Sequence, residues 1–237
     1  RRITDHLSAE IQSTISVGKI EYKFFNILNL NDIIIKDQNN DTLFYSQKAS
    51  IGIKHLDLLN KSVTLGHIVA ENSVVALITD STGVMNLTWY LDLIKNDKDT
   101  LKKSKTIFKI NQTDIINARF SLINIPGEKN KSGIDFNNLH LTGVNGTLVD
   151  FINRDDTTSF SINGLSFRES GGFNVTRMNS DVRLAKNDIF FRSAFLNCDS
   201  SIININHAGI HGDSAESFKN FNDEVRIDIQ IRSEERR

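Results

Sequence analysis

The sequence predicts a mostly β protein whose strands form an antiparallel meander. Short apolar runs with alternating polar and apolar side chains recur along the 237 residues, at a spacing of roughly ten residues. Asn, Asp and Gly gather at the breaks between these runs, where they favour turns. Only one proline, Pro126, is present. Because proline cannot donate to a sheet ladder, its near absence is consistent with long, continuously paired strands.

The first element expected is a short amphipathic helix over residues 2–16. Apolar side chains recur there at every fourth position, namely Ile3, Leu7, Ile11 and Ile15. Gly18 then breaks the helical pattern. Residues 19–37 are rich in β-branched and aromatic side chains, which are typical of strands. The following "QNNDT" supplies the residues of a hairpin turn.

Residues 43–54 show the clearest strand pattern in the chain. One face carries Leu43, Tyr45, Ala49, Ile51 and Ile53, and the other carries Ser46, Lys48, Ser50 and Lys54. Phe44 on the polar face and Gln47 on the apolar face are the two exceptions to this period of two. The period predicts a strand with one apolar and one polar face.

Two sheet segments joined by a linker are predicted for the rest of the chain. Residues 63–80 read as two strands broken at "ENS", and a short helix is expected near 86–95 with Asn86 as its N-cap. The charged residues 96–106 predict a linker. It separates a first segment, 1–95, from a second segment of strands, 107–237.

A weak internal similarity accompanies these strands. In "LNLNDIIIKD", "IDFNNLHLTG" and "FSINGLSFRE", Asn stands just ahead of a short apolar run. The similarity is too loose to define a repeat.

Composition and charge exclude some classes of function. Lys and Arg number 28 against 29 Asp and Glu, for a formal net charge of −1, so we expect no nucleic-acid partner. One cysteine, Cys198, allows no internal disulfide. The chain begins at Arg1 without an initiating Met or an apolar signal sequence. We therefore expect it to be a segment excised from a longer protein.

No arrangement of residues predicts catalysis, a cofactor or a metal. His207 and His211 lie four residues apart in "HAGIHGD", but this Gly-containing stretch is a poor helix and we expect a solvent-facing loop. No basic neighbour would stabilise a thiolate at Cys198, so we expect a structural thiol. We predict that the protein is not an enzyme.

The order of these pieces resembles the N-terminal region of a known family, the AsmA-like translocation and assembly module (TamB-like) proteins of the Bacteroidetes type. The resemblance rests on a short helix followed by "ISVGKIEYKFFNILNLNDIIIKDQ", "DTLFYSQKASIGIK", "DLLNKSVTLGHIVAENSVVAL" and "NLTWYLDLI" ahead of a charged linker. It continues through "INQTDIINARFSLIN" and "GIDFNNLHLTGVNGTLVDF" in the second half.

This resemblance implies a fold, a location and a function. The expected fold is an elongated, curved antiparallel sheet, a half-pipe of the bridge-like lipid-transfer type. The expected location is the periplasm, tethered to the inner membrane by an N-terminal anchor that is absent from this sequence. The expected function is to move phospholipid toward the outer membrane, or to assist outer-membrane assembly proteins, through an apolar groove. Candidate lining residues for that groove are Leu43, Tyr45, Ile51 and Ile53.

Two other functions compete with this one. Sheet edges or the charged linker would serve a protein-interaction scaffold in the cell envelope. Scattered carboxylates would serve a carbohydrate-binding or carbohydrate-active β-sandwich. The sequence leaves open the ligand, the direction of transport, the strand register and the oligomeric state.

Overall fold

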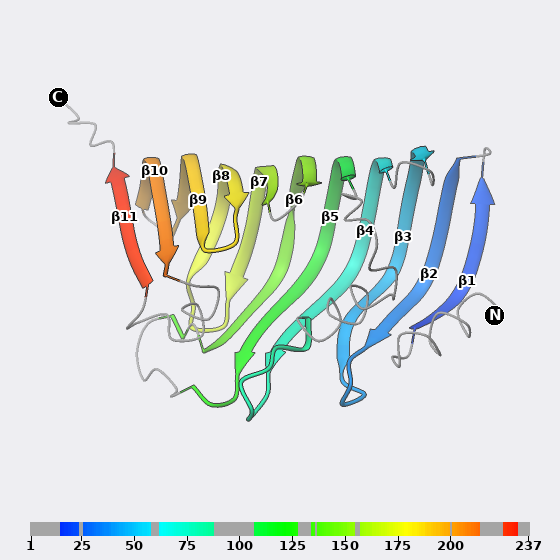
Figure 1. Ribbon diagram of the computed structural model, residues 1–237, viewed down its shortest axis with the longest axis horizontal. Coiled ribbons are helices and arrows are strands. Elements are labelled where there is room, and N and C mark those ends of the chain that lie inside the picture. Colours follow the sequence, from blue (N-terminus) through cyan, green and yellow to red (C-terminus); the bar gives the residue numbers. More distant parts are fainter. Residues whose placement is uncertain are drawn as a thin grey trace, which may run out of the picture.

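In the computed structural model, the chain forms one open sheet of eleven strands, arranged in the order in which they occur along the chain (Figure 1). The structure describes residues 15–23, 26–57, 62–87, 107–127, 134–135, 137–154, 157–199, 201–213 and 225–231. The strands are β1 (Ile15–Lys23), β2 (Ile27–Lys36), β3 (Thr42–Asp57), β4 (Ser62–Thr79), β5 (Ile107–Asn124), β6 (Asn138–Arg154), β7 (Thr157–Glu169), β8 (Asn174–Leu184), β9 (Asp188–Cys198), β10 (Ser201–Gly212) and β11 (Val225–Ile231). The predicted mostly β, curved half-pipe is confirmed.

The predicted antiparallel pairing holds for every neighbouring pair of strands except β4 and β5, which are parallel. Parallel neighbours need a crossover connection, and residues 80–106 provide it. The predicted linker, 96–106, lies outside the described residues. The two segments that it joins, 1–95 and 107–237, contribute strands to the same continuous sheet.

Several predicted elements differ in the structure. Ile15 and Ser16 belong to β1, so the expectation that the first helix extends to residue 16 is wrong, and residues 1–14 lie outside the described part. "ENS" is no break, because β4 runs through it as a single strand of 18 residues. Asn86 and Leu87 are helical, whereas residues 88–95 of the second expected helix are not described.

Each strand from β1 to β10 bends at a point where the alternation of side chains is interrupted. In β3, Ser46 and Ala49 are buried, with 0% and 6% of their surface exposed, whereas Gln47 and Lys48 between them are both exposed. Two consecutive residues therefore face outward. The corresponding pairs along the sheet are Gly18–Lys19, Asn31–Asp32, Gln47–Lys48, Glu71–Asn72, Ile116–Asn117, Thr142–Gly143, Asn163–Gly164, Thr176–Arg177, Arg192–Ser193 and Asn206–His207.

The backbone at these bends often takes a left-handed conformation. Asp32, Asn72 and Asn117 have φ angles of 51°, 50° and 52°. Asn and Asp tolerate this region better than other non-glycine residues. In β1 to β5 the bends lie opposite one another in the strand register, so they form one straight crease. In β6 to β8 the bends are staggered and coincide with shifts in register.

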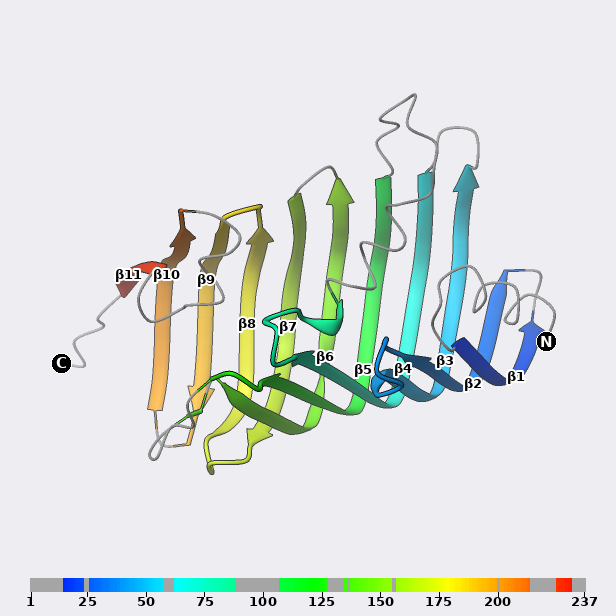
Figure 2. The same ribbon diagram turned by 60° about the horizontal axis from the view of Figure 1, so that its bottom comes forward.

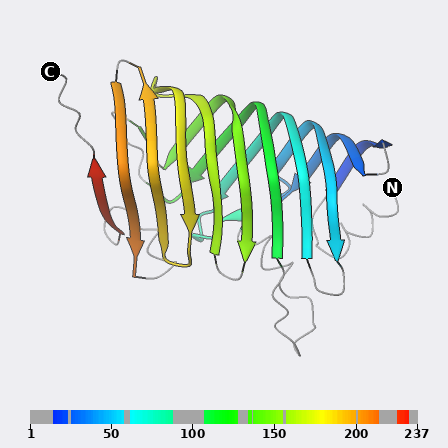
Figure 3. The ribbon, with the colours of Figure 1, turned by 90° about the horizontal axis from the view of Figure 1, so that it is seen from above.

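The crease divides the sheet into two arms, which Figures 2 and 3 show from two directions. We call the arm that holds the β2–β3 turn the first arm, and the arm that holds the connection from β3 to β4 the second arm. Small side chains occupy the inner corner between the arms, because little space remains where the two arms converge. They are Ser46, Ser73, Ala118, Ser180 and Ala194, all buried. Their burial identifies their face of the sheet as the concave one.

Candidate functional site

The concave face of the sheet is apolar along all eleven strands. Alternation and strand register assign the side chains to faces, because directly opposite residues share a face. On the first arm this face carries Ile35, Phe44, Val75, Leu77, Phe120, Leu122, Leu141, Phe167, Met178, Leu196 and Ile203. On the second arm it carries Ile20, Leu28, Ile51, Ile68, Ile115, Leu148, Ile162, Val182, Phe191, Ala208 and Ile229.

Aromatic rings add to this face at the far end of the second arm. The rings of Phe108 and Phe151 meet edge to face, with centroids 6.1 Å apart. Phe151 and Phe160 are stacked, again with centroids 6.1 Å apart. Such pairs contribute packing energy beyond the area that they bury.

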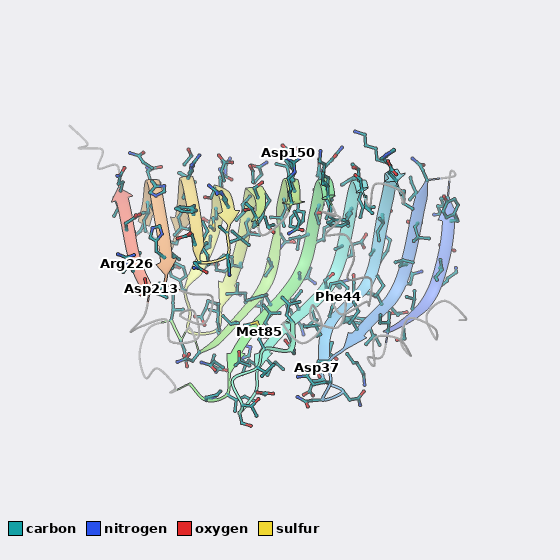
Figure 4. The ribbon with its side chains drawn as sticks, viewed as in Figure 1. Asp37, Phe44, Met85, Asp150, Asp213 and Arg226 are labelled. Carbon is teal, nitrogen blue, oxygen red and sulfur yellow. The ribbon has the colours of Figure 1, made fainter. Side chains whose placement is uncertain are left out.

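The convex face carries many charged and amide side chains beside apolar ones such as Ile34 and Val74, and several of the charged groups pair across the strands. Lys48 forms a salt bridge to Glu71 at 2.6 Å, and His67 contacts Asp114 at 2.7 Å. Figure 4 draws the side chains of the described residues as sticks, coloured by element.

Side-chain amides form a ladder along the outside of the crease. Asn72 Nδ2 donates to Gln47 Oε1 at 2.6 Å, and Asn117 Nδ2 donates to Asn72 Oδ1 at 2.6 Å. The backbone N–H of Asn117 donates to Asn145 Oδ1 at 2.8 Å. The ladder links β3, β4, β5 and β6 at the point where each strand bends. It therefore holds the crease in shape from the convex side.

The four predicted lining residues do not all lie on the concave face. Ile51 and Ile53 lie on the concave face. Tyr45 lies on the opposite face, because the bend at Gln47 reverses the alternation within β3. Leu43 is buried, with 5% of its surface exposed, and lies at a shift in register between β2 and β3.

The surroundings of Tyr45 agree with that placement. Its hydroxyl donates to Asp32 Oδ1 at 3.2 Å. Desolvation, followed by the bond to the Asp32 carboxylate, raises the pKa of Tyr45. Phe44 and Ser46, which the simple alternation assigned to the polar face, lie on the concave face instead. The bend thus explains why Phe44 and Gln47 were exceptions to the alternation in the sequence.

Among the described strands, each makes extensive contact only with its neighbours in the sheet. Apolar side chains at both edge strands are largely exposed. Ile20 and Tyr22 of β1 are 54% and 61% exposed, and Ile227, Ile229 and Ile231 of β11 are 54%, 52% and 63% exposed. Within the described part of the chain, the apolar face therefore runs from one edge strand to the other, and we call it the trough.

Two shallow hollows lie on the opposite, convex face. One, of about 460 Å³, is lined by Thr142, Gly143, Ser166, Phe167, Arg168, Asn174, Val175 and Thr176. The other, of about 330 Å³, has Asp150, Asp181, Arg183 and Arg192 among its lining residues. Most of the lining residues belong to the convex face, but Phe167 of the concave face also lines the first hollow.

The residues weighed for catalysis or metal binding have structural partners. His207 and His211 lie in β10, so the expected solvent-facing loop is wrong. His211 contacts the carboxylates of Asp188 and Asp228. Cys198 is buried, as a structural thiol would be. Over the described ranges, no group of three or more His, Cys, Asp or Glu side chains is arranged to hold a metal ion.

Comparison with known proteins assigns no family to this chain. No protein-family model matches it, and no curated protein matches its sequence. Among the residues that the structure describes, no helix is long and apolar enough to cross a membrane. The trough itself is therefore the main functional evidence.

Proposed function

We propose that this chain is a non-enzymatic, periplasmic segment of an envelope-biogenesis protein, and that its concave face carries the acyl chains of phospholipids. The observation that supports the proposal is the apolar trough, which spans all eleven strands and ends in exposed Ile and Tyr side chains at both edges. Large exposed apolar surfaces in folded proteins commonly mark a binding site.

Burial of hydrocarbon supplies the binding energy in this proposal. Each methylene group that leaves water for an apolar surface contributes about 0.8 kcal/mol. A lipid lying in the trough would bury its acyl chains against side chains such as Ile51, Leu122 and Phe167, while its headgroup stays in water. The apolar side chains continue across the described strands from β1 to β11, which would give a lipid a path along the sheet.

The cellular role follows from the resemblance of the sequence to the translocation and assembly module family. In this role the full-length protein is tethered to the inner membrane. It moves phospholipid toward the outer membrane, or supports the assembly of outer-membrane proteins.

Lipid uptake by matched variants tests the proposal. The purified chain is incubated with phosphatidylethanolamine and phosphatidylglycerol vesicles, re-isolated, and analysed by native mass spectrometry and lipid extraction. Ile51→Glu places a charge in the trough, and Ser50→Glu places the same charge on the convex face one residue away. We expect lipid to copurify with the wild type and with Ser50→Glu, and to fall by at least about tenfold in Ile51→Glu, since a carboxylate in hydrocarbon is costly.

Two results would contradict acyl-chain binding. One is that the wild type takes up no lipid. The other is that the two variants, both folded by circular dichroism, take up equal amounts, because the lipid would then bind away from the trough.

A second candidate function is that of a protein-interaction scaffold, and the open edges of the sheet favour it. β1 and β11 are the first and last strands of the described sheet and carry exposed apolar side chains, and an edge strand can accept a strand from another protein. Crosslinking in native envelopes from residues of β1 and β11 would recover a protein partner if this function holds. Recovery of lipid alone would favour the first proposal.

A further inference from the structure

One imidazole joins the last three strands of the sheet. His211 lies in β10, and its Nδ1 is 2.8 Å from Asp188 Oδ1 in β9. Its Nε2 is 3.2 Å from Asp228 Oδ2 in β11. A carboxylate can only accept a hydrogen bond, so both contacts are hydrogen bonds at once only when both ring nitrogens carry a proton. The geometry therefore suits the imidazolium form.

Two other titratable side chains of β10 and β11 lie close to this arrangement. Arg226 of β11 is its directly opposite residue in the strand register. His207 of β10 is also near Asp228, but its Nε2 lies 3.5 Å from Asp228 Oδ1. Asp228 is thus the carboxylate that both histidines approach, whereas among the described side chains Asp188 contacts His211.

The neighbouring residues leave room for the His211 ring. Phe190 of β9 packs against it edge to face, with centroids 5.4 Å apart, and Arg183 of β8 stacks on the other side of Phe190 at 5.7 Å. Gly209 lies between the two histidines in β10, and its backbone N–H donates to Asp228 Oδ1 at 3.0 Å. A Cβ at Gly209 would come within 2.9 Å of that same oxygen and would also collide with the ring of His211. Glycine at this position is therefore needed for the arrangement.

We propose that His211 is a pH-sensitive clasp that fastens the edge strand β11 to β9 and β10. In the protonated form the ring holds Asp188 and Asp228 together. In the neutral form the ring has a single N–H, so one of the two carboxylates loses its hydrogen bond.

The direction of the pH effect follows from the two carboxylates. The hydrogen bond to Asp188 and then that to Asp228 raise the pKa of His211 above its ordinary value of 6.5. A group with a raised pKa in the folded state contributes stability that is fully present below pH 6.5 and is lost as the pH rises through the raised value. β11 is thus held more firmly in mildly acidic solution than in alkaline solution.

The clasp also bears on the trough. Ile227, Ile229 and Ile231 of β11 extend the apolar concave face by one strand beyond β10. Loosening of β11 shortens that face at its edge. This consequence rests on the proposed function, whereas the clasp does not, because it concerns only the pairing of three strands.

Amide hydrogen exchange on the lipid-free chain tests the clasp. Protection factors, corrected for the intrinsic effect of pH, are compared for β11 at pH 5.5 and pH 8.5, with β3 as the internal reference. In the wild type we expect β11 protection to fall by roughly twofold to fivefold at the higher pH, the size of effect that exposed ion pairs produce, while β3 stays unchanged. His211→Gln, which keeps a hydrogen-bond donor without a titratable charge, should make β11 protection independent of pH.

His207→Gln is the matched control, because it removes the longer of the two contacts to Asp228 and should retain the pH dependence. Two results would overturn the proposal. One is that β11 protection in the wild type is the same at pH 5.5 and pH 8.5. The other is that β11 protection in His211→Gln still depends on pH. If His211→Gln does not fold, the pKa of His211 is measured in the wild type by nuclear magnetic resonance titration. A pKa at or below 6.5 would refute the clasp. None of these readouts involves lipid, so failure of the clasp is distinguishable from failure of acyl-chain binding.

Discussion

Replacing Asn117 tests whether the left-handed residues along the crease hold the sheet in its bent shape. Asn117 has a φ angle of 52°, and its side chain donates to Asn72 in the outer amide ladder. Asn117→Val introduces a β-branched side chain that disfavours this backbone conformation. Asn117→Gly is the matched control, since glycine adopts the conformation freely but also lacks the amide.

The expected magnitudes can be worked from these two effects. The left-handed conformation costs an ordinary side chain about 1–2 kcal/mol, and a β-branched residue falls at the upper end. Loss of the exposed hydrogen bond to Asn72 costs about 0.5–1 kcal/mol. Asn117→Val should therefore lower the free energy of unfolding by about 2–3 kcal/mol. Asn117→Gly should lower it by about 1 kcal/mol, including the greater freedom of glycine in the unfolded chain.

Urea unfolding followed by far-ultraviolet circular dichroism measures both values, provided that the transition is two-state. The backbone N–H of residue 117 still reaches Asn145 Oδ1 in both variants, so that bond cancels in the comparison. Equal destabilisation by Val and Gly, within about 0.5 kcal/mol, would refute the reasoning. The conformational preference of Asn117 would then make no contribution to the stability of the bend.

Two further predictions concern β6 and Asp114. Gly146→Ala should cost about 2–3 kcal/mol of unfolding free energy, because its Cβ would lie 2.7 Å from the Cα of Leu165 and its φ is 156°. Gly143→Asn in the same strand, at a φ of 59° with open space around it, should cost less than about 1 kcal/mol, and an equal cost in urea unfolding would contradict this. Burial alone would raise the pKa of Asp114, but hydrogen bonds from Gln112, His67 and Thr147 together hold it below its ordinary 3.8. This carboxylate therefore contributes stability that is present above pH 3.8 and lost as the pH falls through the lowered value. Thr147→Val should move the Asp114 pKa upward in a carboxyl titration by nuclear magnetic resonance, whereas Ser161→Ala should leave it in place, and an unmoved pKa in Thr147→Val would count against the hydrogen-bond explanation.

Residues 43–54 show which side chains the local alternation assigns to the correct face of the sheet and which it does not. Ile51 and Ile53 lie on the concave face as the period of two requires. Tyr45 does not, because two consecutive outward residues, Gln47 and Lys48, reverse the period within the strand. The same kind of interruption at Asn72 made one long strand look like two.

A signal for the bends was nevertheless present in the sequence. Asn31 and Asn163, noted ahead of short apolar runs, both belong to the outward pairs, and each precedes a residue with positive φ, Asp32 and Gly164. The Asn137–Asn138 pair in the third similar stretch lies instead at the start of β6. Two adjacent polar or glycine residues between inward apolar ones mark a bend more reliably than Asn alone.

The sequence by itself determined that this chain makes long strands with one apolar and one polar face. That information is local, since side-chain alternation depends only on neighbours along the chain. Only the tertiary structure decided that β4 and β5 pair in parallel, that the crease makes the apolar face concave, and that His211 meets Asp188 and Asp228 from two other strands. Those features depend on strand register and on left-handed backbone geometry at the bends. Both depend on packing between residues far apart in the sequence, which the alternation of side chains along one strand cannot predict.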